Sequence, residues 1–179
     1  MTDKLKTVLA IIILFLSLIT PVTGLLYGLG RWDALTILLV MGGIFVAFFA
    51  GGVLVLATVK DFTWMTASLP FLFSSFYTIL PDFPGPIDDA AVTSAGALIT
   101  YFFALRRNEG TPKWIIIPLL LAGAYTLLGG SFFPGPIDEV VVDVIALLIA
   151  SYGARTAEKQ AQLAESAGES EHAPPFVEE

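Results

Sequence analysis

Long apolar runs separated by short polar segments cover most of this chain. The pattern predicts six membrane-spanning helices, at 7–29, 35–59, 62–80, 89–105, 114–130 and 139–156. Hydrophobic residues make up 56% of the 179 residues and charged residues 14%, a balance that does not describe a soluble domain. We therefore predict an all-α protein, a polytopic membrane helical bundle embedded in a lipid bilayer.

The positions of the basic residues predict how the helices are oriented. Cytoplasmic loops collect Lys and Arg. With the N-terminus inside, only Arg31 falls outside, whereas eight basic residues fall on the cytoplasmic side: Lys4, Lys6, Lys60, Arg106, Arg107, Lys113, Arg155 and Lys159. We expect a multi-pass protein of the cell membrane with both termini cytoplasmic. The first apolar run also resembles a signal peptide, but no A-x-A-like cleavage site follows it, which favours a retained helix.

A hexapeptide, F-P-G-P-I-D, occurs twice, at 83–88 and 133–138, and a second acid follows each copy. Trp64 and Trp114 precede the two copies at matching positions. We predict a tandem repeat of a two-helix hairpin whose copies run in the same sense about an axis along the membrane normal. The expected divisions are two N-terminal helices (1–60), repeat 1 (61–110), repeat 2 (111–157) and an acidic cytoplasmic tail (158–179) that begins as a helix and is largely disordered.

The repeated segments combine turn-forming residues with acids. Proline and glycine favour a chain reversal, and proline suits the first turn of a helix. The predicted elbows are Pro84, Gly85 and Pro86, with Pro134, Gly135 and Pro136. The acids that follow are Asp88, Asp89, Asp138 and Glu139, at helix starts where the dipole favours negative charge. Helix-starting chemistry alone is sufficient to explain this pattern.

The same acids are also candidates for a functional site. A twofold axis can bring both elbows together on the outer face, where clustered carboxylates raise some pKa values or bind a cation such as Ca²⁺, Mg²⁺ or Mn²⁺. Asp143 lies one turn beyond Glu139, and Thr93 is its counterpart in repeat 1, so a polar path can lead inward from the outer acids. Equally, Asp143 can be hydrated near the interface or bonded to a neighbouring helix.

Two stripes of small residues predict helix packing within the bundle, with a second copy or with a partner subunit. They are Gly43, Ala47 and Gly51, and Ala146, Ala150 and Ala154. The three tryptophans, Trp32, Trp64 and Trp114, have positions typical of interfacial anchors.

The segment 77–89, Y-T-I-L-P-D-F-P-G-P-I-D-D, resembles the core of the YkvA-like domains of unknown function, in which a P-D-[apolar]-x-P segment, a glycine and a terminal Asp-Asp join two apolar helices. The resemblance implies a membrane helical hairpin and supplies no activity.

Several functions are not expected. The chain has no cysteine, and its one histidine, His172, lies in the tail, which excludes thiolate metal sites and histidine-ligated haem in the spans. The residues suggest no enzyme, and a net charge of −7 argues against nucleic-acid binding. Two classes remain: a structural or accessory subunit of a membrane assembly, which we favour from sequence, and a small cation or proton transporter or channel that uses the outer acids and Asp143.

Overall fold

The computed structural model describes residues 2–28, 30–60, 63–78, 86–128 and 137–171. All regular elements in these ranges are helices, and these ranges contain no β-strand. The predicted all-α class is therefore confirmed for the described part of the chain.

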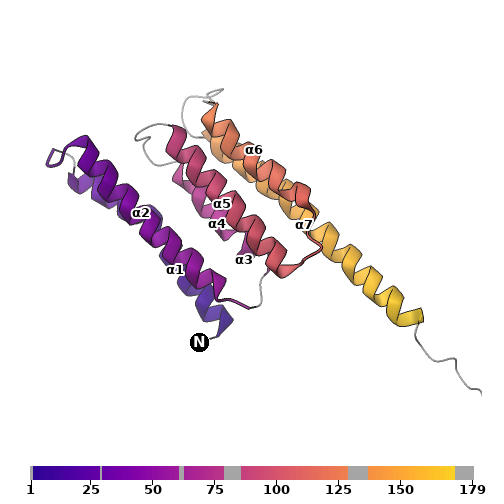
Figure 1. The fold of residues 1–179 in the computed structure, drawn as a ribbon. Coiled ribbons are helices and arrows are strands. Elements are labelled where there is room, and N and C mark those ends of the chain that lie inside the picture. Colours follow the sequence, from indigo (N-terminus) through magenta and orange to yellow (C-terminus); the bar gives the residue numbers. More distant parts are fainter. Residues whose placement is uncertain (1, 29, 61–62, 79–85, 129–136, 172–179) are drawn as a thin grey trace, which may run out of the picture.

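The helices form three antiparallel pairs that lie side by side (Figure 1). The first pair is α1 with α2, the second is the short α3 and α4 with α5, and the third is η1 and α6 with α7. Their bounds are α1 Asp3–Gly28, α2 Ala34–Ala57, α3 Trp64–Ala67, α4 Leu69–Tyr77, α5 Pro86–Arg107, η1 Lys113–Ile115, α6 Ile116–Leu127 and α7 Ile137–Glu171.

Three helical segments are long and apolar enough to cross a membrane: Asp3–Gly28, Leu35–Ala57 and Asp138–Ala164. Helices occur in all six segments that hydropathy predicts, but α4 has 9 residues and α6 has 12. A crossing of the hydrocarbon core by helix alone needs about 20 residues. The expected membrane association is thus supported by α1, α2 and α7.

The first pair is closely packed through a small residue. A Cβ atom placed on Gly52 of α2 would lie 2.6 Å from Leu14 Cγ of α1, so a larger side chain there would displace the helices. Asp33 caps the start of α2, because its Oδ1 accepts a hydrogen bond of 2.9 Å from the Thr36 backbone N–H.

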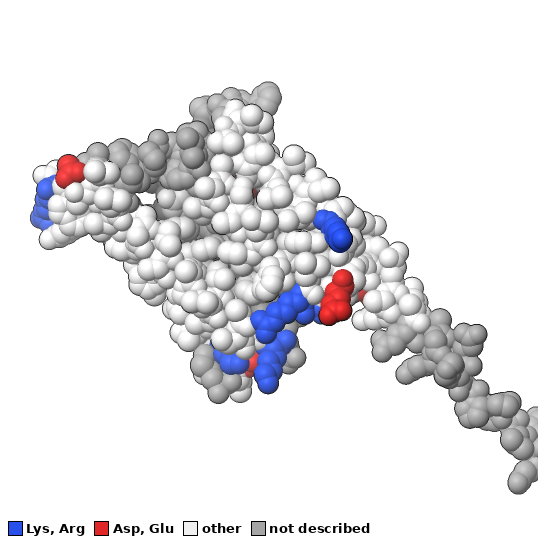
Figure 2. Space-filling view, in the orientation of Figure 1, with Lys and Arg blue, Asp and Glu red and all other residues white. Residues whose placement is uncertain are grey.

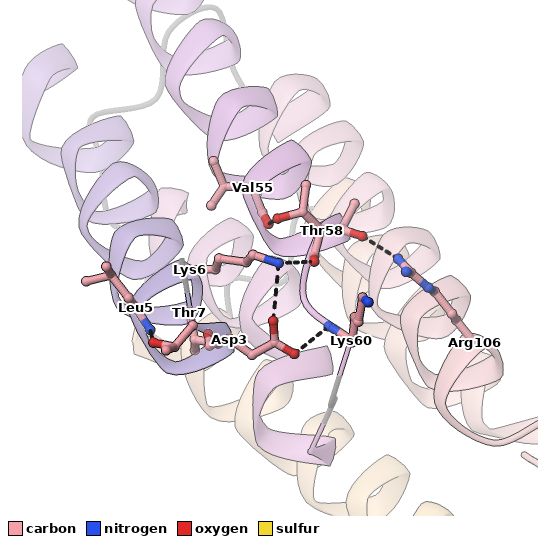
Figure 3. A network of polar contacts seen from close by, with 10 residues as sticks. Asp3, Leu5, Lys6, Thr7, Val55, Thr58, Lys60 and Arg106 are labelled. Carbon is pink, nitrogen blue, oxygen red and sulfur yellow. Dashed lines mark hydrogen bonds and ion pairs between the residues drawn. The ribbon is translucent and has the colours of Figure 1, made fainter.

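A polar network ties the opposite end of this pair together (Figure 3). Asp3 lies 3.2 Å from Lys6 Nζ and also accepts a 2.9 Å hydrogen bond from the Lys60 backbone N–H. Lys6 donates to the Thr58 carbonyl at 2.8 Å, and Arg106 of α5 donates to the Ala57 carbonyl. The network satisfies carbonyl groups that the end of α2 leaves without helical partners. Most basic side chains visible in Figure 2 gather at this end of the molecule.

The second pair contains an interrupted helix. α3 ends at Ala67 and α4 begins at Leu69, with Pro70 in its first turn. The backbone N–H of Phe71 donates to Thr100 Oγ1 of α5 at 3.0 Å. Because proline disturbs the helical hydrogen bonds around it, this contact provides a partner from the neighbouring helix.

The last helix is longer than the predicted span. α7 continues beyond residue 156 to Glu171 and projects past the other helices (Figure 1). A salt bridge between Arg107 at the end of α5 and Glu158 joins this extension to the bundle. The tail therefore begins as a continuation of α7, and residues 172–179 lie outside the described part.

Candidate functional site

Asp143 of α7 is buried inside the bundle, with 2% of its surface exposed. Neither of its carboxylate oxygens has a hydrogen-bond partner among the described residues. The polar group next to it is the Ser75 hydroxyl of α4. That hydroxyl donates a 2.9 Å hydrogen bond to the Phe71 carbonyl, its own neighbour in α4, rather than to Asp143.

A cavity of about 20 Å³ lies beside this carboxylate, between α4 and α7. Such a volume accommodates about one water molecule. Apart from the Ser75 and Asp143 side chains, its lining is apolar: Phe71, Leu72, Phe76, Val140, Val144 and Leu147. An ionised carboxylate in these surroundings costs several kcal/mol unless it is paired or hydrogen-bonded. Because the surface that faces the cavity is almost entirely apolar, the site favours a bound proton over a cation or an ordered water.

Thr93 of α5 is completely buried, and its hydroxyl also has no hydrogen-bond partner in the described ranges. Its helix approaches α6 closely. A Cβ atom on Gly123 of α6 would lie 2.5 Å from Ser94 Oγ and 3.3 Å from the Ala90 carbonyl oxygen of α5. Gly123 thus allows α5 and α6 to pack closely, whereas the contact of α4 with α7 contains the Asp143 cavity.

The described acids that follow the two elbows are largely buried rather than solvated. Asp138, 8% exposed, accepts a 3.0 Å hydrogen bond from the Tyr125 hydroxyl through Oδ2, while its Oδ1 has no partner among the described residues. Asp89 is 3% exposed, and Glu139 is half-buried in the first turn of α7. Asp88 lies in the first turn of α5, and its side chain is outside the described part.

No group of three or more His, Asp or Glu side chains in the described ranges could hold a metal ion. The divalent cation expected at the elbows also involved Asp88, whose side chain is not described. Of the elbow residues, Pro86 is the first residue of α5. The others, Pro84, Gly85, Pro134, Gly135 and Pro136, lie outside the described residues.

The two stripes of small residues have different surroundings. Ala146, Ala150 and Ala154 are buried and pack in one cluster with residues of η1 and α6. Gly43 and Ala47 are exposed and Gly51 is half-buried. Spacing alone did not identify Gly52, the glycine that contacts α1 most closely.

Sequence reasoning missed three polar contacts inside the bundle. They are the approach of Ser75 to Asp143, the Tyr125–Asp138 hydrogen bond and a hydrogen bond from the Trp64 indole to Ser151. Trp64 was expected as an interfacial anchor, and its indole is 7% exposed and hydrogen-bonded inside the bundle. The available signal was polar residues, such as Ser75, inside otherwise apolar runs.

An apolar groove of about 490 Å³ separates α2 from α5. It is lined by Phe45, Val46, Phe49, Ala50, Val53 and Leu54 of α2 and by Ala91, Val92, Ala95 and Ile99 of α5. The exposed small-residue stripe lies on the same helix, α2, as one wall of this groove.

No protein-family model, curated protein or solved structure matches this chain.

Proposed function

We propose that this chain is a multi-pass membrane protein that carries a proton or another small cation, with Asp143 as the central binding group. The observation that carries the proposal is the buried Asp143 carboxylate, whose two oxygens have no hydrogen-bond partner among the described residues. Ionisable residues inside membrane spans are costly and often belong to ion or proton pathways. Solvated acids would have argued against transport, and Asp89, Asp138 and Asp143 are instead buried.

The proposed topology has six spans with both termini in the cytoplasm. The basic residues near the ends of α2 and α5 support it, since Figure 2 shows them at one end of the molecule. α4 and α6 are short, and the predicted ends of the third and fifth spans, at residues 80 and 130, lie outside the described residues.

Asp143 then lies inside the hydrocarbon core but nearer its outer side, one turn or about 6 Å along the axis from Glu139. It precedes Arg155 of the same helix, and a rise of 1.5 Å per residue puts about 18 Å between them along the axis. Half of a hydrocarbon core of about 30 Å is about 15 Å. This depth makes an unpaired charge at Asp143 costly and favours a bound cation or proton.

The duplicated hairpin offers an explanation for a single site. In the proposed repeat, α4 corresponds to α6 and α5 to α7, so the contact of α4 with α7 is equivalent to that of α6 with α5. At the contact of α6 with α5, Gly123 allows close packing, and Thr93 of α5 has the position equivalent to Asp143. At the contact of α4 with α7, the cavity and Asp143 occur instead. We propose that only the contact of α4 with α7 conducts.

A structural or accessory role is the second candidate. The apolar groove between α2 and α5 and the exposed Gly43 and Ala47 favour it, because membrane helices associate through small residues. A partner helix or a second copy of the chain would be the expected occupant of that surface. In this alternative, Asp143 has no role in transport.

Cation flux into proteoliposomes distinguishes the two candidates. Purified protein is reconstituted with an imposed gradient of H⁺, Na⁺ or K⁺, and uptake is compared among wild type, Asp143→Asn and Asp33→Asn. The control removes an exposed acid while Asn still caps α2. Transport predicts flux of at least one cation that Asp143→Asn reduces to the level of protein-free vesicles and Asp33→Asn retains. Background flux of all three cations in wild type would leave the structural role.

A further inference from the structure

We infer that the species bound at Asp143 is a proton, accepted by its carboxylate in the seam between α4 and α7, rather than a metal cation. The inference rests on the proposed transport function and specifies its substrate. Three features of the seam carry it: the orientation of the Ser75 hydroxyl, the small number of oxygen ligands and the distribution of charge around the site.

We infer that the Ser75 hydroxyl acts as an acceptor toward Asp143, because its hydrogen already has a partner within α4. A serine hydroxyl has one hydrogen, and Ser75 donates it to the Phe71 carbonyl at 2.9 Å. Ser74 donates to the same carbonyl at 2.8 Å, so both hydroxyl hydrogens are directed along α4. Lone pairs of Ser75 Oγ remain available toward α7. They complement a carboxylic acid, which donates a hydrogen bond, and not a carboxylate, which only accepts.

The side chains of the seam offer too few oxygens for a metal. Ca²⁺ takes six to eight oxygen ligands and Mg²⁺ needs a near-octahedral set. Beside the cavity, the side-chain oxygens come from Asp143 and Ser75, and the other lining side chains are apolar. A Na⁺ or K⁺ ion would also have to replace its hydration shell with protein oxygens. A cavity of about 20 Å³ admits about one water molecule, too few to supply that shell.

The charges around Asp143 also leave it without a counter-ion. Glu139, one turn away on α7, acts on it with a like charge. Three of the helices packed against α7, namely α3, α4 and α6, carry no Asp, Glu, Lys, Arg or His, and their titratable groups are Tyr77 and Tyr125. α5, which meets α7 through the Arg107–Glu158 salt bridge, carries its charged residues only in its first and last turns: Asp88, Asp89, Arg106 and Arg107. η1 contributes Lys113, which precedes α6 and lies far from the start of α7. Neutralisation by a proton therefore needs no other residue.

The transfer step balances simply. A proton from a hydrated neighbour binds one Oδ of Asp143, which becomes a neutral carboxylic acid that can donate to Ser75 Oγ, and the neighbour remains as water. Release transfers the same proton to a water on the other side and restores the carboxylate. No other bond forms or breaks, and no oxidant or reductant is needed.

Infrared titration combined with flux tests the inference on the full chain. The C=O stretch of a protonated carboxylic acid is followed in reconstituted wild type, Asp143→Asn, Ser75→Ala and Ser74→Ala, with and without Na⁺, K⁺ and Ca²⁺ at constant pH. Ser74→Ala is the matched control, because both serines donate to Phe71. The inference predicts a band that Asp143→Asn removes, that Ser75→Ala moves to higher frequency, and that Ser74→Ala and the metal ions leave unchanged. Proton flux should be lost only in Asp143→Asn and lowered in Ser75→Ala.

The contrary outcomes separate the two proposals. If Na⁺, K⁺ or Ca²⁺ changes the Asp143 band at constant pH and the Asp143-dependent flux is of that ion, the proton inference is wrong and the transport proposal stands. If no cation shows Asp143-dependent flux, the transport proposal fails and the inference with it. Asp143→Glu, which keeps the acid, provides the folded variant that should retain proton flux if Asp143→Asn fails to reconstitute.

Discussion

The Trp64 indole N–H donates a hydrogen bond to the Ser151 hydroxyl, which joins the start of α3 to α7 across the bundle. Ser151 in turn donates to the Leu147 carbonyl at 2.6 Å, one turn closer to Asp143 on the same helix. Positions 143, 147 and 151 recur every four residues and therefore share one face of α7. The hydrogen bond from Trp64 to Ser151 thus connects α3 to the face of α7 that carries Asp143.

Ser151→Ala should destabilise the bundle by about 1–3 kcal/mol, because it leaves the buried Trp64 N–H without an acceptor. Trp64→Phe removes the donor as well as some apolar surface. In the double variant the loss should be smaller than the sum of the two single losses, since the shared hydrogen bond is counted only once. Thermal unfolding in detergent measures all three, and strict additivity would show that the two side chains do not interact.

Gly52→Ala should separate α1 from α2 and cost about 1–3 kcal/mol, as overpacking of a close contact does. The added Cβ would lie 2.6 Å from Leu14 Cγ. Gly43→Ala is the matched control in the same helix, because nothing lies within 4 Å of its added Cβ, and it should be neutral or stabilising. Unfolding midpoints of the two variants provide the comparison. Equal losses would contradict the close contact at Gly52.

The N-cap of α2 should weaken in acid. Hydrogen bonds from the Thr36 backbone N–H and hydroxyl hold the pKa of Asp33 below its ordinary value of 3.8. A lowered pKa in the folded state means that the cap contributes its full stability above the unfolded pKa and loses it as the pH falls through the folded one. Wild type should therefore lose more stability than Asp33→Asn below about pH 3.8. Parallel pH profiles of the two proteins would exclude this contribution.

The salt bridge between Arg107 and Glu158 should contribute less than about 1 kcal/mol, because both side chains are partly exposed. Arg107→Glu should weaken the attachment of the α7 extension, and adding Glu158→Arg should restore it. Limited proteolysis of the extension reports the attachment, and added salt should reduce the differences. If the double exchange cleaves as fast as Arg107→Glu, the ion pair does not hold the extension.

The helices were predictable because each apolar run reflects a local property, transfer into lipid, that every residue in the run shares. α2 and α7 begin within two residues of the predicted starts at 35 and 139, whereas α1 begins four residues before the predicted 7 and ends within one residue of the predicted 29. The end of α7 was not predictable from hydropathy, since residues after 156 continue the helix without being apolar. Good helix formers such as Ala, Glu, Lys and Gln explain that extension.

Partners inside the bundle were harder to predict. Asp143 stood out as an acid in an apolar run, but Ser75 lies far away in the sequence, and no periodicity joins the two. Likewise, α2 has small residues on several faces, so spacing could not decide between Gly51 and Gly52 as the contact with α1. Which face meets which neighbour depends on the packing of whole helices, which single-helix patterns do not contain.

Proton entry into vesicles tests the central claim most directly. Vesicles that contain a trapped pH-sensitive dye and equal amounts of wild type or Asp143→Asn are given the same pH gradient, with a potassium diffusion potential to remove charge build-up. The account predicts rapid acidification with wild type and only the leak of protein-free vesicles with Asp143→Asn. Equal rates for the two proteins would contradict a proton-carrying role for the buried carboxylate.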